Sequence, residues 1–191
     1  MGCCEQQNCG CSDPISATTV GATGATGPAG PPANSALYDN VGTANANATV
    51  LEESLDDYTL PASGSGLPTL STNGDYLEIV DYFSVKASTG THTFIIKYGA
   101  VELIRQNITA GTSTSIKVRS YIYRVSSAAQ GYNVEFEWAD GDKWQGKIVK
   151  PLAALANDLT LATIIDAKVI AVNIGDITHK GKVVTLFKKA S

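Results

Sequence analysis

The chain has 191 residues, of which 43% are hydrophobic and 17% are charged, enough for one domain with an appendage or for two small units. Residues 1–85 contain ten acidic and no basic residues (−10), whereas residues 86–191 contain all 14 bases and the remaining eight acids (+6). The bases are scattered and no apolar stretch reaches 18 residues, so we expect neither a nucleic-acid interface nor a membrane span.

Residues 1–20 are a polar segment of small residues that cannot build a core by itself. They contain all the cysteines of the chain, Cys3, Cys4, Cys9 and Cys11, so we expect no disulfide to hold the remainder of the chain together. The thiols leave three interpretations open: a metal site, although the spacing differs from the common Cys-x2-Cys pairs, interchain disulfides, or a segment that docks onto another protein. We favour docking and predict that this segment is an anchor.

Residues 21–33 are predicted to form a collagen-like stem. The stretch "GATGATGPAGPP" (21–32) places a glycine at every third position, namely Gly21, Gly24, Gly27 and Gly30. That spacing matters only where three chains crowd around a common axis. Four triplets are too short to trimerise by themselves, because ordering each residue costs about 1–2 kcal/mol. The sequence therefore predicts a short triple helix held together by trimerisation elsewhere in the chain; the alternative is a flexible linker.

Residues 34–47 are predicted to be a linker, and strand-like patterns begin at about residue 48. We expect strands or hairpins at 48–61, 74–87, 91–108 with a turn at Gly99, 112–125, 132–149 around Asp140-Gly141, 167–175 and 181–189. The one helix candidate is 150–159. Regularly spaced short strands predict an all-β fold, a jelly-roll-type β-sandwich that spans residues 48–191.

Alternation assigns a face to each residue of the strand expected at 74–87. In 74–87 one face holds Tyr76, Glu78, Val80, Tyr82 and Ser84, and the other holds Leu77, Ile79, Asp81, Phe83 and Val85. Near the C-terminus, "VIAVNI" and "VVTLF" are apolar on both faces. We therefore expect those strands to lie beneath another sheet or against another subunit.

A collagen-like stem before a β-sandwich resembles the trimeric jelly-roll proteins of the complement-C1q and tumour-necrosis-factor type. Within that plan, residues 51–103, with "YTLP", "NGDYLEI" and a strand that ends in Tyr-Gly, resemble the C-terminal domains of bacteriophage fibre and head-fibre proteins. The stem also resembles collagen-like glycoproteins of bacterial spore surfaces, but "NGDYLEI" favours the phage proteins. The resemblance implies a homotrimer that is assembled in the host cytoplasm and displayed on the virion surface.

Three functions follow from this interpretation. The first is a short virion fibre whose N-terminal segment binds the capsid or another virion protein, because the chain lacks the coiled-coil or β-helix repeats of a long shaft. The second is a tail-fibre or tail-spike head that binds a host receptor or glycan, and the third is a spore-surface filament. Aromatic side chains of the middle strands are candidates for glycan binding or for the trimer interface: Tyr121, Tyr123, Trp138 and Trp144.

The sequence shows no pattern that indicates catalysis. Its two histidines, His92 and His179, lie far apart and no Ser, Asp or Cys motif accompanies them. We therefore expect no enzyme activity and no cofactor, and we assign no residue as a metal ligand. The "ADGDKW" stretch (139–144) is interpreted as a hairpin turn, since a calcium loop would need more oxygen ligands.

Overall fold

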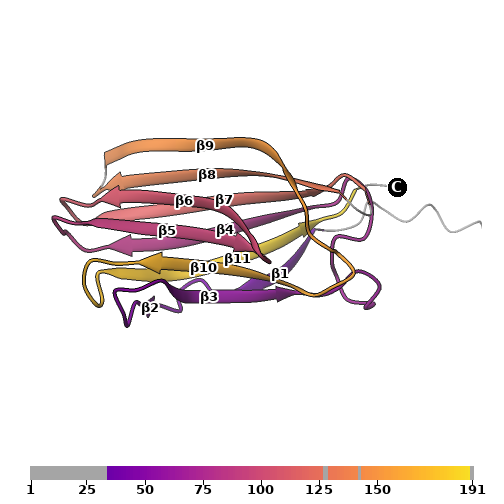
Figure 1. Cartoon of the computed structure of the whole chain (residues 1–191), viewed down its shortest axis with the longest axis horizontal. Coiled ribbons are helices and arrows are strands. Elements are labelled where there is room, and N and C mark those ends of the chain that lie inside the picture. Colours follow the sequence, from indigo (N-terminus) through magenta and orange to yellow (C-terminus); the bar gives the residue numbers. More distant parts are fainter. Residues whose placement is uncertain (1–33, 127–128, 142, 190–191) are drawn as a thin grey trace, which may run out of the picture. The chain divides into compact units, whose positions relative to one another are not determined.

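The computed structural model describes residues 34–126, 129–141 and 143–189, which form two antiparallel sheets (Figure 1). The strands are β1 (Ser35–Asp39), β2 (Asn45–Ala46), β3 (Glu53–Leu60), β4 (Tyr76–Val85), β5 (Thr91–Tyr98), β6 (Val101–Thr109), β7 (Thr114–Arg124), β8 (Gln130–Asp140), β9 (Lys143–Leu155), β10 (Thr163–Ile170) and β11 (Ile177–Phe187). These ranges contain no helix, which confirms the predicted all-β sandwich. In the same ranges, no helix that could span a membrane is found.

The strand order is that of a jelly roll. The larger sheet has the order β1-β11-β4-β7-β8-β9, with β2 also on β11, and the smaller sheet has the order β3-β10-β5-β6. Four antiparallel pairs are nested along the chain, namely β1–β11, β3–β10, β4–β7 and β5–β6, and successive pairs alternate between the sheets. This arrangement is one long hairpin rolled into two layers. The hairpin β8–β9 extends the larger sheet beyond β7.

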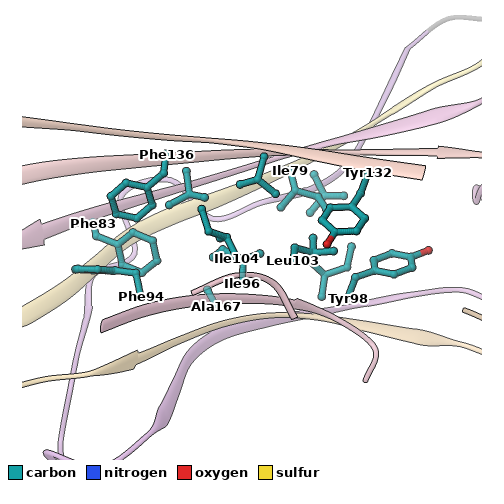
Figure 2. Packing of buried hydrophobic residues seen from close by; sticks show 14 of the residues in the cluster. Ile79, Phe83, Phe94, Ile96, Tyr98, Leu103, Ile104, Tyr132, Phe136 and Ala167 are labelled. Carbon is teal, nitrogen blue, oxygen red and sulfur yellow. The ribbon is translucent and has the colours of Figure 1, made fainter. Parts of the chain in front are cut away.

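The core lies between the two sheets, where every second side chain of each strand points inward. In β4 the inward residues include Ile79 and Phe83, on the face that the alternation predicted to be apolar. Phe94 of β5 packs against both Phe83, at 5.2 Å between ring centroids, and Phe136 of β8, at 5.8 Å. Figure 2 shows these rings facing one another across the layer. Interdigitation of this kind fixes the register of both sheets.

Two tight turns carry the glycines that the sequence singled out. Gly99 connects β5 to β6 with φ +59°, and Gly141 follows β8 with φ +56°. Both values lie in the left-handed region, where a residue without Cβ is not strained. The predicted hairpins at 91–108 and 132–149 are therefore confirmed.

Two local predictions were wrong. The range 34–47, expected as a linker, contains β1 and β2, which both pair with β11 and so belong to the sandwich. The helix candidate 150–159 is instead occupied by β9 as far as Leu155. Pro151 is compatible with this strand because β9 lies at the edge of its sheet, where a missing N–H breaks no ladder on the open side.

The sandwich has two distinguishable ends. At the end that we call proximal, β1 begins at Ser35, opposite Leu186 near the end of β11. The loop before β4 is fixed here by Asp75, whose carboxylate is 1% exposed and accepts hydrogen bonds from the Lys188 ammonium (3.0 Å) and the backbone N–H of Thr72 (2.8 Å). The opposite end, where β4 ends at Val85 and β7 begins at Thr114, is the distal end. Figure 1 shows β4 and β11 running in opposite directions between these ends.

Candidate interaction surface

Four aromatic side chains meet on the outer face of the larger sheet at its proximal end. We call them the aromatic patch: Tyr76 of β4, Tyr121 and Tyr123 of β7, and Phe187 of β11. Tyr76 stacks on Phe187 with 4.5 Å between centroids and lies 5.7 Å from Tyr123, which is 6.2 Å from Tyr121. All four are half-buried, although no second layer of the described residues covers this face. Aromatic residues that are half-buried and contiguous are typical of interaction surfaces.

The patch brings together residues from neighbouring strands that the register aligns. Tyr76 pairs with Tyr123 on one side and with Phe187 on the other. Burial raises the pKa of the Tyr121 hydroxyl above its usual value, with Arg119 opposing this and Glu78 adding to it. Burial likewise raises the pKa of Tyr123. Both phenols are therefore uncharged at neutral pH, which suits an apolar contact.

Next to the patch, the same face carries a network of ion pairs. Arg119 of β7 lies 3.0 Å from Glu78 and 3.7 Å from Glu135, and Lys147 of β9 lies 3.0 Å from Glu135 and 3.3 Å from Glu137. These side chains form ion pairs along a row across the sheet, with three carboxylates and two cations. They separate the aromatic patch from the distal part of the face.

A depression of about 520 Å³ occupies the distal part of the same face. We call it the distal depression; its walls include Val41, Tyr82, Ser84, Ser115, Lys117 and Lys180. The Lys117 ammonium lies 5.9 Å from the centre of the Tyr82 ring. Within the described ranges neither Lys117 nor Lys180 forms an ion pair or a side-chain hydrogen bond, so two uncompensated ammonium groups border the depression.

The outer face of the smaller sheet is different in character. Glu52 lies within 3.5 Å of three cations, Lys97, Arg105 and Lys168. Arg105 is also 2.9 Å from Glu102. We call this the charged face. Its ion pairs are solvent-exposed and compensated, which is typical of a hydrated surface.

A polar cluster lies inside the sandwich, between β3 of one sheet and β4 and β11 of the other. The His179 ring lies 3.1 Å from Asp81 and 3.8 Å from Asp56, and one ligand atom of each residue falls within 4.8 Å of the other two. The Lys182 ammonium, fully buried, binds the backbone oxygens of Asp56 (2.9 Å) and Ile165 (3.1 Å) and lies 3.8 Å from Asp81. Since the cluster contains its own cation, we interpret it as a structural element that ties the two sheets together.

The residues singled out from the sequence fall into different parts of the molecule. Tyr121 and Tyr123 lie in the aromatic patch, whereas Trp138 points to the inner side of its sheet, with its ring centroid 6.1 Å from that of Phe136. Trp144 lies in β9, but its side chain is outside the described part of the chain. The predicted anchor (1–20) with Cys3, Cys4, Cys9 and Cys11, and the predicted stem (21–33) with Gly21, Gly24, Gly27 and Gly30, also lie outside the described residues.

Sequence reasoning did not assign Tyr76, Phe187, Tyr82, Lys117 or Lys180 to a site. A usable signal existed for the first and third, because the alternation of 74–87 placed Tyr76 and Tyr82 together on the face opposite the apolar one. For Phe187 the signal was weaker: it ends "VVTLF", which is apolar on both faces. The two lysines carry no signal that distinguishes them from other surface lysines.

Comparison with known proteins adds little to this geometry. No protein-family model and no curated protein matches the chain. Among solved structures, it is similar to a chain in the structure of infectious bursal disease virus, Gx strain, at 10% identity and a TM-score of 0.31. The match covers 82% of this chain and 42% of the viral one. At this TM-score the likeness carries no argument about function.

Proposed function

We propose that this protein is a virion structural protein, a short trimeric fibre that projects from a phage capsid and is anchored by residues 1–20. Two features support it: the resemblance of residues 51–103 to phage fibre and head-fibre domains, and a β-sandwich with jelly-roll strand order, which is the architecture that this resemblance implies for the head. In this proposal the stem is a triple helix, and the sandwich forms the head.

The position of the aromatic patch supports the proposed trimer. Pro32 ends the collagen-like stretch, and Ser35 begins β1 only three residues later, which is at most about 11 Å of extended chain. Ser35 pairs with Leu186, next to Phe187 of the aromatic patch. Three chains that meet in the stem would therefore bring three aromatic patches close together. Burial of these patches against one another would supply the association that four triplets lack.

A second candidate function is a receptor-binding head, which is favoured by the distal depression. It lies at the end of the head away from Ser35, where β1 begins, and in the proposed fibre that end would meet a host surface. The two functions share the trimer and differ in where the protein is attached and in whether the head binds a ligand. A spore-surface filament, the third interpretation, also shares the trimer.

Light scattering on the full chain and on a version that starts at Ser35 tests the trimer. We expect both to have the mass of three chains, because the head drives assembly. If only the full chain is trimeric, association belongs to residues 1–34 and the role of the aromatic patch is wrong. If both are monomeric, the fibre proposal falls.

Electron microscopy with a gold-labelled antibody against the head tests the attachment site. Label over phage capsids supports the first function, and label at tail tips supports the second. Label on spores would overturn both in favour of the filament.

A further inference from the structure

We propose that the distal depression binds an acidic sugar unit, a uronic or nonulosonic acid, through the carboxylate and one face of the ring. The inference rests on the second candidate function and names its ligand. It depends on four features of the described residues: the place of the depression in the head, the way its wall is built, its uncompensated charge and its size.

The depression lies far from the surface that we assign to trimer contact. Tyr82 and Tyr76 both point outward from β4 but are six residues apart, which corresponds to about 20 Å along a strand. The ion pairs of Arg119 and Lys147 lie between the two regions. A head that associates through its proximal patch would keep the depression accessible at the opposite end.

One wall of the depression is built by an irregularity in β11. The pairing of β11 with β4 shifts register between His179 and Gly181, so Lys180 is the extra residue of a bulge. Bulges re-aim side chains and recur next to binding sites. The backbone N–H of Gly42 donates to the carbonyl of Lys180 at 3.0 Å, which fixes the neighbouring Val41 at the rim.

The close approach of that loop requires a glycine at position 181. Its φ is +144°, and a Cβ added there would lie 2.5 Å from Val41 Cα and 3.0 Å from Val41 N. No larger side chain could be accommodated without moving the loop. The absence of a side chain at Gly181 therefore lets Val41 lie against the bulge, on the side of the depression that carries Lys180.

The chemistry of the lining matches a carboxylate joined to a polyhydroxylated ring. Lys117 and Lys180 supply two ammonium groups that carry no ion pair with any described residue, so each can donate to an anion. Glu137 also borders the depression, opposite Lys117 in the β7–β8 ladder; Lys147 lies 3.3 Å from it and is shared with Glu135, so the two lysines still exceed the acidic groups of the lining by one charge. Ser84 and Ser115, opposite each other in the β4–β7 ladder, offer hydroxyls that donate and accept.

The Tyr82 ring and the size of the depression favour a sugar over a bare anion. A volume of about 520 Å³ is in the range of small-molecule sites, about 300–1,000 Å³. Phosphate would fill only a small part of it. An aromatic ring presents a flat apolar surface, which the C–H face of a pyranose can cover. A neutral sugar would leave both ammonium groups without an anionic partner.

Calorimetric titration of the full-length protein tests the proposal with three probes: D-glucuronate, N-acetylneuraminate and D-glucose. We expect at least one acidic sugar to bind, and glucose to bind about tenfold more weakly or not at all, since it lacks the charge-assisted bond. Lys117→Ala and Lys180→Ala should each weaken binding by about tenfold. The matched control is Lys97→Ala, which removes a lysine from the charged face and should leave the affinity unchanged.

Two further measurements complete the test. Light scattering on each variant shows whether the trimer is retained. A trimer that does not bind sugar contradicts only the binding proposal, whereas a monomer contradicts the fibre proposal. Competition with inorganic phosphate shows whether the ring contributes, and Tyr82→Ala should weaken the acidic sugar while leaving any phosphate binding intact.

Several outcomes would overturn the inference. These are an intact trimer that binds none of the three probes, equal affinity for glucose and the acidic sugars, or phosphate that binds as tightly as the sugar acids. Binding that depends on Lys97 and is indifferent to Lys117 and Lys180 would move the site to the charged face.

Discussion

The two outer faces of the sandwich share the same strand geometry but differ in the side chains that their outward positions hold. On the smaller sheet, Glu52 is surrounded by three cations, and two of these, Arg105 and Lys168, flank the fully buried Ile95 in the strand register. On the larger sheet, ion pairs occupy the middle, but one end is aromatic and the other holds two unpaired lysines. The ion pairs of the charged face are satisfied among the described residues, whereas the larger sheet leaves an aromatic patch and positive charge available to another molecule.

This difference leads us to expect that the interactions of the protein involve the larger sheet, whose outward positions leave more unpaired. Both sheets contribute equally well to the core, as the Phe83–Phe94 contact across the layer illustrates. Their outer faces are under no such shared constraint. We therefore expect substitutions on the larger sheet to alter association, and equivalent substitutions on the charged face to have little effect.

The largest effect is expected from a charge placed in the aromatic patch. Tyr123→Glu puts a carboxylate beside Tyr76 and Tyr121, so it should weaken self-association by about 100-fold or more, as for a hot-spot residue. Light scattering would then show single chains with an unchanged far-ultraviolet circular dichroism spectrum. The control is Asn107→Glu, an exposed position of β6 on the outer face of the smaller sheet. Equal loss of the trimer in both variants would contradict the assignment of the interface.

A second comparison separates an inner aromatic residue from an outer one. Phe94 is fully buried, so Phe94→Ala should lower the free energy of unfolding by about 3–5 kcal/mol. Phe187→Ala should cost the single chain much less, because Phe187 lies at the surface, yet it should weaken the trimer. Urea unfolding at low and high protein concentration measures both. If the two variants lose a similar free energy of unfolding in dilute solution, Phe187 stabilises the single chain as a core residue does, which would contradict this prediction.

The smallest effects concern charge, and they should depend on burial. Burial tends to raise the pKa of Asp75, but hydrogen bonds from Lys188 and from the backbone of Thr72 and Lys189 outweigh it and hold the pKa below its usual value. The pKa is lower in the folded than in the unfolded chain. Its contribution to stability is therefore complete above the unfolded pKa, about 3.9, and is lost as the pH falls through the folded value.

Asp75→Asn should accordingly destabilise the protein at pH 7, and the difference from the parent should shrink in acid. Urea unfolding at several pH values measures this. Glu52→Gln is the matched comparison: its cationic partners also lower the pKa of Glu52, but the group lies on an exposed, screened face, so the change should have the same sign and be much smaller. A pH-independent effect of Asp75→Asn would show that its carboxylate contributes nothing to the acid dependence.

Most of the fold could be predicted because its information is local. The alternation in 74–87 and 112–125, and turn glycines such as Gly99 and Gly141, fix strands and hairpins without reference to the rest of the chain. Strand β1 was missed because "SALYD" has no strong pattern and becomes a strand through pairing with β11, about 150 residues away. The false helix at 150–159 arose from its Leu and Ala content, which local propensity favours and sheet pairing overrides.

The interaction surface was harder to predict because it depends on long-range register. Tyr76 and Phe187 stack only because β4 and β11 are neighbours, and no local pattern reveals this. Lys180 borders the depression because it is the extra residue of a bulge, and no sequence pattern predicts this bulge. Asp81 is the instructive exception: a carboxylate on the apolar face of 74–87 was a visible sign of the buried cluster with His179 and Lys182.

The pairing of β1 with β11 also constrains the order of assembly. Contacts between the first and last strands have the greatest sequence separation in the described part of the chain, so closing them is slow and requires nearly the whole polypeptide. A nascent or truncated chain cannot complete the larger sheet, and Tyr76 cannot stack on Phe187 before the last strand is made. In the proposed trimer, the triple helix of the stem would therefore form only after three completely folded heads have associated. Incomplete chains would then be excluded from the fibre.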